Sequence, residues 1–238
     1  MADRIEPMRR LARAIPGGMA LGRWLRRHFD PALREIHRLQ TGEPGLLQPF
    51  PDTLEERYPE LFDAIAARLA ELPSPRILSF GCSSGAEVRA LKRRIPTARI
   101  VGLDLNRRVI ARARAADPDG DYRIAAAPSA GEQFDAILAM AVLRHGQLES
   151  ERPQNCAAIM PFARFDDALA ALDSALAPGG WLAIGNAHFR LADAALTARY
   201  EPDPAEFPQL SHPNLLYGPD DRRIELPGRI AVLHRKLD

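Results

Sequence analysis

The chain has 238 residues and a formal net charge of +1, which suits one large domain and gives no overall attraction to nucleic acid. Its two cysteines, Cys82 and Cys156, exclude a disulfide framework and a cysteine-rich zinc site, and they suit a reducing compartment. No apolar run is long enough to span a bilayer and the basic N-terminus does not look like a signal peptide, so the sequence predicts a cytoplasmic protein.

The first forty residues carry more arginine than acid and predict two amphipathic helices, broken at residues 16–18. Such a basic arm could touch a membrane surface or hold an anionic substrate, but we favour an extension that packs on the core. A further helix is predicted over 52–72, with Asp52 or Thr53 as its cap. We therefore expect an N-terminal helical extension over 1–72 and a catalytic domain over 73–238.

Strands and helices alternate from Ile77 onward, which predicts a mostly parallel sheet with helices on both faces. The last part of the chain differs, because short apolar runs surround a turn at 218–220 and predict at least one reversal of direction. The expected strands cover 77–80, 98–103, 121–125, 134–139, 181–185, 214–217, 224–226 and 230–234, and the expected helices cover 106–116 and 162–176.

A small-residue loop, Gly81-Cys82-Ser83-Ser84-Gly85, joins the first strand to a helical pattern. Glycine lets the backbone approach a ligand closely, and the new helix presents free N–H groups, so this order is typical of a nucleotide-type site. The loop lacks both the G-x-G-x-x-G pattern of dinucleotide sites and the Gly-Lys-Ser/Thr of a Walker loop. An ordinary strand-to-helix turn is the alternative interpretation.

The residues Gly-Cys-Ser-Ser-Gly-Ala-Glu, 81–87, resemble the first motif of class I S-adenosylmethionine (SAM) methyltransferases. They are most similar to the chemotaxis-receptor branch, which has Gly-Cys-Ser-Thr-Gly-Glu-Glu, and Ala86 departs from that pattern. The resemblance implies a Rossmann-like, doubly wound, seven-stranded sheet with an antiparallel C-terminal hairpin. It also implies that Glu87 faces the amino group of the cofactor. The cofactor residues implied here are Ser79, Gly81, Cys82, Ser83, Gly85 and Glu87.

Asp104 stands at the end of the second predicted strand, where a carboxylate can accept hydrogen bonds from both ribose hydroxyls of an adenosine. The segment 100–106 is similar to the second motif of the family, which implies that Asp104 and Leu105 contact the SAM ribose. Nicotinamide dehydrogenases also use an acid at this point, so a dehydrogenase stays an alternative. A simple helix-capping role for Asp104 is the structural alternative.

The segment 134–145 matches the fourth strand of the family, which implies that Met140 and Ala141 lie beside the cofactor. The chemotaxis-receptor branch has Arg-Asn at these two positions. The departure argues against methylation of receptor glutamates, as does the N-terminal part of the chain. It leaves open a SAM-binding regulatory or scaffold protein without transfer activity, and a protein carboxyl methyltransferase.

His145 and His188 are the candidate catalytic residues, because each follows the carboxyl end of a predicted strand and histidine can take a proton near neutral pH. In an extended chain Asn186 and His188 would lie on one side, so one could orient an acceptor and the other accept its proton. Ordinary structural hydrogen bonds are the alternative for both histidines. We give little weight to Cys82 as a nucleophile.

The sequence thus predicts a SAM-dependent methyltransferase without a metal, acting on a small molecule or on a glycan or lipid precursor. It predicts no nucleic-acid partner, and it leaves the acceptor atom and the oligomeric state open.

Overall fold

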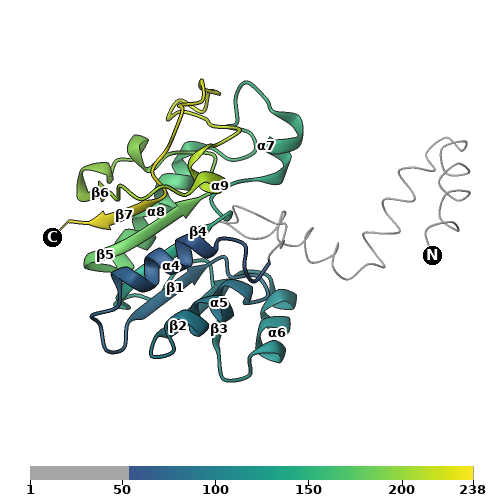
Figure 1. Cartoon of the computed structure of the whole chain (residues 1–238). Coiled ribbons are helices and arrows are strands. Elements are labelled where there is room, and N and C mark those ends of the chain that lie inside the picture. The colour runs from purple at the N-terminus through teal and green to yellow at the C-terminus, as the bar shows by residue number, and fades with distance from the viewer. Residues whose placement is uncertain (1–53, 238) are drawn as a thin grey trace, which may run out of the picture. The chain divides into compact units, whose positions relative to one another are not determined.

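The computed structural model of the chain describes residues 54–237 (Figure 1). The chain divides into two compact units, 1–43 and 44–238, and every described residue belongs to the second. The two helices predicted in the first forty residues lie outside the described residues, and so does the predicted cap at Asp52 or Thr53. The domain boundary at residues 72 and 73 stays a prediction.

A seven-stranded sheet forms the centre of the fold, in the order β3-β2-β1-β4-β5-β7-β6. Strands β1 to β5 run parallel, whereas β7 runs antiparallel to both of its neighbours, β5 and β6. This confirms the predicted doubly wound sheet with an antiparallel C-terminal pair. The strands are β1 Arg76–Phe80, β2 Arg99–Asp104, β3 Asp121–Ile124, β4 Phe134–Met140, β5 Leu176–Gly185, β6 Tyr200–Pro202 and β7 Leu233–Lys236.

Each strand of the centre buries alternate residues on the two faces of the sheet, as the two-residue period requires. Ile77 and Leu138 belong to one apolar cluster, whereas their neighbours Leu78 and Ile137 belong to the other. The first cluster is covered by α4, Pro59–Arg68, with α5, Ala86–Arg94, and α6, Arg107–Ala116. The second is covered by α7, Gly146–Glu151, and α8, Phe162–Ala175 (Figure 1).

Helix α8 shows why its sequence forms a helix against this sheet. Phe165, Leu169 and Leu172 recur at spacings of four and three, so their side chains form one stripe, and all three are fully buried. Burying each such side chain contributes roughly 1.5–3 kcal/mol relative to exposure. Helix α6 begins as predicted, because the side chain of Asn106 accepts hydrogen bonds from the backbone N–H groups of Arg108 and Val109.

The helix predicted over 52–72 is shorter than expected, because α4 begins only at Pro59. Proline favours the first helical position and disfavours helical backbone in the residue before it, so it sets the start. Glu55 therefore does not lie in the first turn of a helix. It pairs with Arg89 of α5 at 2.5 Å, while Glu56 pairs with Arg94 of the same helix at 2.9 Å.

The strands predicted at 214–217 and 224–226 are wrong, since only an isolated bridge joins Tyr217 to Arg223 there. The C-terminal antiparallel pair is instead built from β6 and β7, with the short helix α9, Pro208–Ser211, between them in the chain. Leu215 and Leu216 are buried without joining the sheet. An apolar run indicates that a segment is buried, but buried segments can be either strands or irregular, so the run alone did not predict a strand correctly.

Helix α7 and the early start of β5 at Leu176 were not predicted either. Within residues 54–237, no helix has the length and apolar character needed to cross a bilayer.

Candidate active site

The carboxyl ends of β1, β2, β4 and β5 lie on one edge of the sheet, here named the carboxyl rim (Figure 1). Three strands end there in left-handed backbone: β1 at Gly81 with φ 73°, β4 at Ala141 with φ 57° and β5 at Asn186 with φ 52°. Positive φ is uncommon for residues other than glycine and is concentrated at functional sites. The rim is therefore shaped by strained turns as well as by strands.

The glycine loop is fixed to β2 by its own backbone. The N–H groups of Gly81 and Cys82 both donate to the carbonyl oxygen of Leu103, at 2.8 Å each. Gly85 has φ 75°, and a Cβ placed on it would lie 2.7 Å from the ring of Tyr122. Glycine is therefore required at position 85 by a neighbouring side chain of the protein itself.

Asp104 joins the two sequence motifs. One carboxylate oxygen accepts from the backbone N–H of Ser83 at 2.9 Å, and the other accepts from the N–H of Asn106 at 2.8 Å. Burial raises the pKa of Asp104, and the hydrogen bonds from Asn106 and Ser83 oppose that rise. The carboxylate is thus held in place between the loop and β2, and its two oxygens have more lone pairs than the backbone donors use. Leu105 follows it and is half-buried.

Glu87 is the second carboxyl group of the cofactor side. Its Oε1 accepts a hydrogen bond from the Ser79 hydroxyl at 2.7 Å, which links α5 to β1. Burial raises the pKa of Glu87 to about 7, while the Ser79 hydrogen bond and the charge of Arg57 act in the opposite direction. A carboxyl group poised at neutral pH gains most from a cationic partner such as an ammonium group.

Cys82 and Met140 serve packing. The Cys82 thiol is buried, and a Cβ placed on Gly102 would lie 2.9 Å from its sulfur. Burial and the charge of Asp104 raise the pKa of this thiol, so it stays protonated and is not an activated nucleophile. Met140 is also buried, and its terminal methyl group lies against Gly185 at the end of β5.

Two residues of the rim make a contact with each other that the sequence did not predict. The Asn186 side-chain amide donates to the Tyr58 hydroxyl at 2.8 Å, which joins the end of β5 to the residue before α4. The prediction that Asn186 and His188 project to the same side of an extended chain is wrong, because Asn186 adopts left-handed backbone. No local sequence pattern pairs residues 58 and 186.

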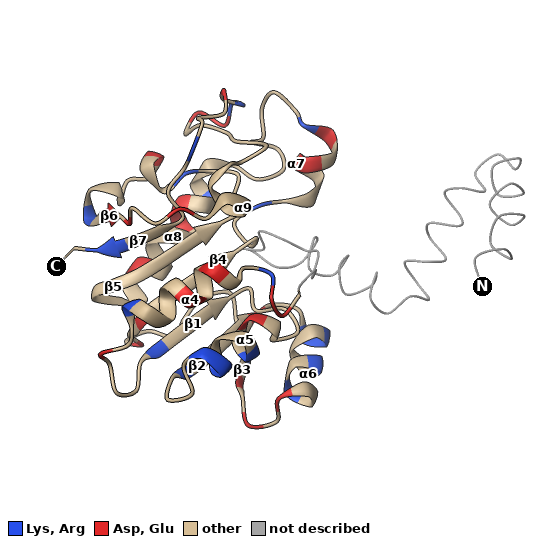
Figure 2. Ribbon diagram, viewed as in Figure 1, with Lys and Arg blue, Asp and Glu red and all other residues tan. Residues whose placement is uncertain are grey.

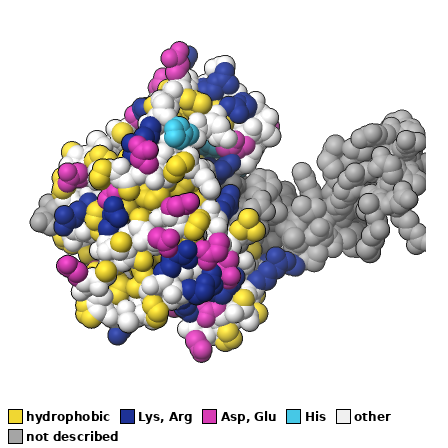
Figure 3. All heavy atoms as spheres, in the orientation of Figure 1, with side chains coloured by type: hydrophobic (Ala, Val, Ile, Leu, Met, Phe, Trp, Pro, Cys, Tyr) yellow, Lys and Arg dark blue, Asp and Glu magenta, His cyan; other side chains and the backbone are white. Residues whose placement is uncertain are grey.

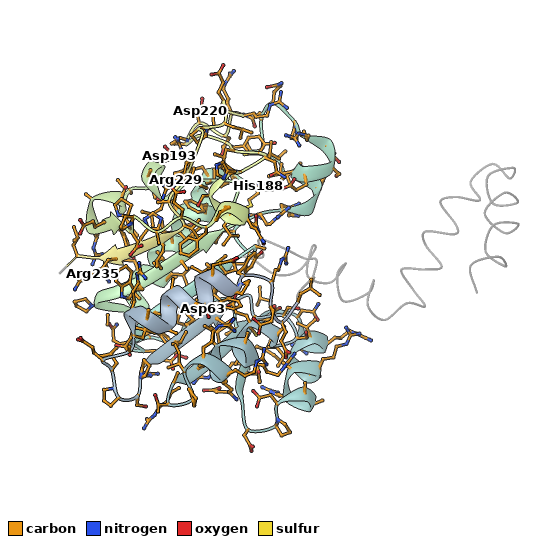
Figure 4. All side chains as sticks on the ribbon, viewed as in Figure 1. Asp63, His188, Asp193, Asp220, Arg229 and Arg235 are labelled. Carbon is orange, nitrogen blue, oxygen red and sulfur yellow. The ribbon has the colours of Figure 1, made fainter. Side chains whose placement is uncertain are left out.

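His188, labelled in Figure 4, is buried and lies beside Glu149 of α7. Its Nε2 lies 3.2 Å from the backbone oxygen of His145 and 3.8 Å from Oε1 of Glu149. A carbonyl oxygen only accepts, so Nε2 carries the proton when the ring is neutral, and burial lowers the pKa of the ring. This geometry is that of a structural hydrogen bond between the ring and the backbone, which was the alternative to a catalytic role.

His145 caps α7, because its Nδ1 accepts the backbone N–H of Gln147 at 3.2 Å. In a neutral ring the proton must then stay on Nε2, which makes that nitrogen a donor. Burial and the charge of Arg164 lower the pKa of His145. In this geometry the helix cap occupies Nδ1 of His145, and Nε2 of His188 serves as a donor to the backbone.

Arg144 and Glu149 complete the group around α7, and no pattern in the sequence pointed to either. Arg144 Nη2 donates to Glu149 Oε1 at 2.7 Å, while the buried Nε of Arg144 has no acceptor among the described residues. The Glu149 side chain is 26% exposed, compared with 2% for His188. Glu149 is therefore the more accessible proton acceptor of this group.

Basic side chains dominate α5 and α6 (Figure 2), and several on α5 are held in ion pairs. Lys92 pairs with Asp117 at 2.5 Å, and Arg94 pairs with both Glu56 and Asp63. Figure 3 shows basic, acidic and apolar side chains intermixed on the face in view. Over residues 54–237, no cluster of three or more His, Cys, Asp or Glu side chains could hold a metal ion.

The family model described as "Methyltransferase domain" matches residues 53–216, more than half of the chain. The chain belongs to this methyltransferase family. Its sheet has the class I methyltransferase fold that the glycine loop and Asp104 led us to predict. The likeness of the loop to the chemotaxis-receptor branch stays a prediction.

Several solved structures are similar to this chain. The plantazolicin methyltransferase in complex with SAH is 16% identical, with a TM-score of 0.42, over 67% of this chain and 55% of that chain. The ribosomal protein L11 methylase of Lactobacillus delbrueckii subsp. bulgaricus is 12% identical, with a TM-score of 0.45, over 75% and 78%. Coclaurine N-methyltransferase bound to N-methylheliamine and SAH is 14% identical, with a TM-score of 0.40, over 77% and 62%.

The chain thus spans about 55% of the length of the plantazolicin methyltransferase. No curated protein sequence matches it significantly.

The rim of this chain has the chemistry that SAM requires. Asp104 can accept from hydroxyl groups, and Glu87 can take an ammonium group. Asp104 is bonded to the glycine loop, and Glu87 lies in the first turn of the helix that follows it. The remaining predicted contacts, Cys82, Ser83, Leu105, Met140 and Ala141, belong to the same loop and strand ends.

Proposed function

We propose that the chain transfers the methyl group of SAM to a small molecule or to a glycan or lipid precursor at the carboxyl rim. The observation that carries this is that Tyr58 lies close enough to both Glu87 and Arg144 for their charges to act on its pKa, and Arg144 is the partner of Glu149. The net charge of +1 gives no support to a nucleic-acid partner, and ion pairs neutralise Lys92 and Arg94 on α5. Family membership supports the reaction type, and the acceptor class is our proposal.

On the cofactor side, we assign Asp104 to the ribose hydroxyls and Glu87 to the amino group. The backbone of the glycine loop, from Gly81 to Gly85, lies along the cofactor. SAM supplies a methyl group that its sulfonium charge already activates. The residues of the rim therefore need to align donor and acceptor and to exclude water.

On the acceptor side, a hydroxyl or amine must lose a proton when it is methylated. We assign that proton to Glu149, whose side chain is more exposed than that of His188 and is oriented by Arg144. The catalytic roles predicted for His188 and His145 stay predictions, and the geometry favours a positioning role for His188. It holds the backbone of His145 while lying beside Glu149.

Three variants separate these roles: Glu149→Gln, His188→Ala and His145→Ala. Loss of a general base lowers the rate of methyl transfer by roughly 10²-fold or more. In the wild type, the transfer rate should rise with pH as the base loses its proton. We expect this loss, and a flattened pH profile, in Glu149→Gln, with SAM affinity unchanged by calorimetry. A wild-type rate and pH profile in Glu149→Gln would remove it from the reaction, and the same loss in His188→Ala or His145→Ala instead would reinstate that histidine.

The acceptor class is tested with methyl-labelled SAM and a cell extract separated into small molecules and macromolecules. We expect the labelled methyl group in the small-molecule or lipid fraction. The control is Asp104→Asn at a SAM concentration too low for that variant to bind SAM, and it should give no labelled product. Label found only as base-labile esters on protein would overturn the proposal and favour a protein carboxyl methyltransferase. Calorimetry with NAD as well as SAM checks the dehydrogenase alternative.

We also keep two finer proposals. The two cysteines are free and buried, which supports the cytoplasm as the compartment. For the basic arm over 1–40, we keep the prediction that its deletion lowers the melting temperature and leaves SAM binding largely intact. A deletion that abolishes only transfer would show instead that the arm covers the acceptor.

A further inference from the structure

The connection between β5 and β6 has an unusual form. These two strands are parallel, with β7 between them, and parallel strands are normally joined by a crossover helix that covers one face of the sheet. Here residues 186–199 contain only two single 3₁₀ turns, Leu191–Asp193 and Thr197–Arg199. The sheet face beside β5, β6 and β7 therefore lacks the usual helical cover.

A cavity of about 260 Å³ occupies this place. The crossover, the strand ends and the segment 227–231 form its walls, and most of its lining is apolar. The volume lies just below the range of roughly 300–1,000 Å³ that is typical of small-molecule pockets, which suits a single ring or a short chain. The main apolar walls are Ile184, Phe189, Leu191, Pro202, Pro227 and Ile230.

The basic groups of the cavity are already neutralised. Arg190 makes two hydrogen bonds of 2.6 Å to the carboxylate of Asp193, and Arg229 donates to Glu206 at 2.5 Å (Figure 4). Burial lowers the pKa of His234 to about 4, so this wall is uncharged at neutral pH. A ligand with its own charge would have to break one of these ion pairs or stay unpaired, which is costly in a largely apolar site.

The cavity adjoins the carboxyl rim through the end of β5. Ile184 and Ala187 line the cavity, whereas the side chain of Asn186, between them, reaches Tyr58 on the α4 side. The same short segment therefore forms a wall of the cavity and a part of the rim. A molecule held in the cavity could extend past the end of β5 toward the rim.

We propose that this cavity binds the uncharged, mainly apolar body of the methyl acceptor, a ring or short chain, and so selects the substrate. The inference rests on the proposed function, because it assumes a small-molecule acceptor. It places substrate selection on segments around β6 and β7, apart from the loop and strand ends that hold the cofactor.

Binding to the cavity can be measured without SAM or the acceptor. The probe is benzyl alcohol, observed by saturation-transfer NMR with the full chain, and benzoate and benzylammonium carry the same ring with a charge. Ala231→Trp fills the cavity from its wall, and Ala192→Phe fills it more mildly from an exposed position. Ala130→Trp, on an exposed loop after β3, is the matched control.

We expect benzyl alcohol to bind the wild type and the control alike, roughly tenfold more tightly than either ion. Both filling variants should weaken it by about tenfold or more, with SAM affinity within about twofold of wild type because the sites are separate. The cavity proposal is overturned if the wild type does not bind the alcohol, if the ions bind as well, or if a folded filling variant binds it normally.

A second arm tests the role of the cavity in the reaction. Benzyl alcohol should compete with the true acceptor and not with SAM, and Ala192→Phe should raise KM for the acceptor. If Ala192→Phe no longer binds benzyl alcohol but keeps a normal KM for the acceptor, the cavity does not bind the acceptor and the proposal is overturned. A macromolecular acceptor would overturn the proposed function, and the probe measurement would still report on the cavity.

Discussion

The two ends of the sheet are built in different ways. On the cofactor side, the loop and Asp104 are joined mainly through backbone N–H groups, within a stretch of chain from Gly81 to Asn106. Around β6 and β7, side chains from distant segments hold the structure, as where Lys236 donates to the carbonyls of Asp173 and Leu176. Backbone contacts, the first design, tolerate many side chains, whereas the contacts of the second design, around β6 and β7, depend on particular side chains.

The largest effect should come from breaking the second design at Asp173, whose carboxylate accepts from Tyr200 and pairs with Arg199 and Lys236. Removing one partner of a buried pair costs about 3–5 kcal/mol, because the other charge stays buried. We expect Asp173→Ala to lower the free energy of unfolding by about 3 kcal/mol in urea. Asp167→Ala, exposed on the same helix, is the control, and equal losses in the two would contradict the network.

Gly85→Val tests the first design. The variant should lower stability by about 2–3 kcal/mol and weaken SAM binding, because it adds backbone strain and overlap with Tyr122. Gly131 is a matched control, since it also has positive φ but a Cβ placed on it would have no neighbour within 4 Å. Thermal unfolding of Gly131→Val should show only the loss of stability that comes from backbone strain, and its SAM affinity should be normal. Retained SAM binding in Gly85→Val would make the loop an ordinary turn.

Asp104→Asn should weaken SAM binding by about thirtyfold, since hydrogen bonds to a charged group are worth roughly 1.5–3 kcal/mol each. The shape of the side chain is kept, so the protein should stay folded. Calorimetry with SAM and SAH measures the change, and circular dichroism checks the fold. An affinity equal to that of the wild type would place the ribose elsewhere.

The pH dependence of SAM binding sharpens the assignment of Glu87. Its pKa of about 7 lies above the ordinary glutamate value of 4.5, so the folded protein holds a proton there that the unfolded chain has lost, and stability falls as pH rises from 4.5 to 7. An ammonium partner needs the ionised form, so SAM affinity should fall about tenfold per pH unit below 7.

Calorimetry in buffers of different ionisation enthalpy should detect a proton released on binding at about pH 6, below the pKa of Glu87. In Glu87→Gln the affinity should be weaker and independent of pH in this range. A wild-type affinity that stays flat from about pH 5 to 8 would separate Glu87 from the amino group.

The contrast between local contacts around the glycine loop and distant contacts around β6 and β7 also explains which features the sequence could predict. The strand, loop and helix around Gly81, and the acid at Asp104, were predicted because their patterns are local. The pairing of β6 with β7 was not, because it joins Tyr200 to Lys236 across a long irregular segment. The place of His188 was also missed, since it depends on the left-handed turn at Asn186, a residue type that tolerates such backbone without requiring it.

The position of β7 between β5 and β6 sets an order of events during synthesis. Strand β6 leaves the ribosome first but has no neighbour to pair with until residues 233–236 follow, roughly 2–6 s later at about 5–20 residues per second. Until then β5 presents an open edge, which is a template for wrong pairing. A nascent chain stalled before Leu233 would therefore hold an unpaired β6 and a sheet whose edge at β5 is open.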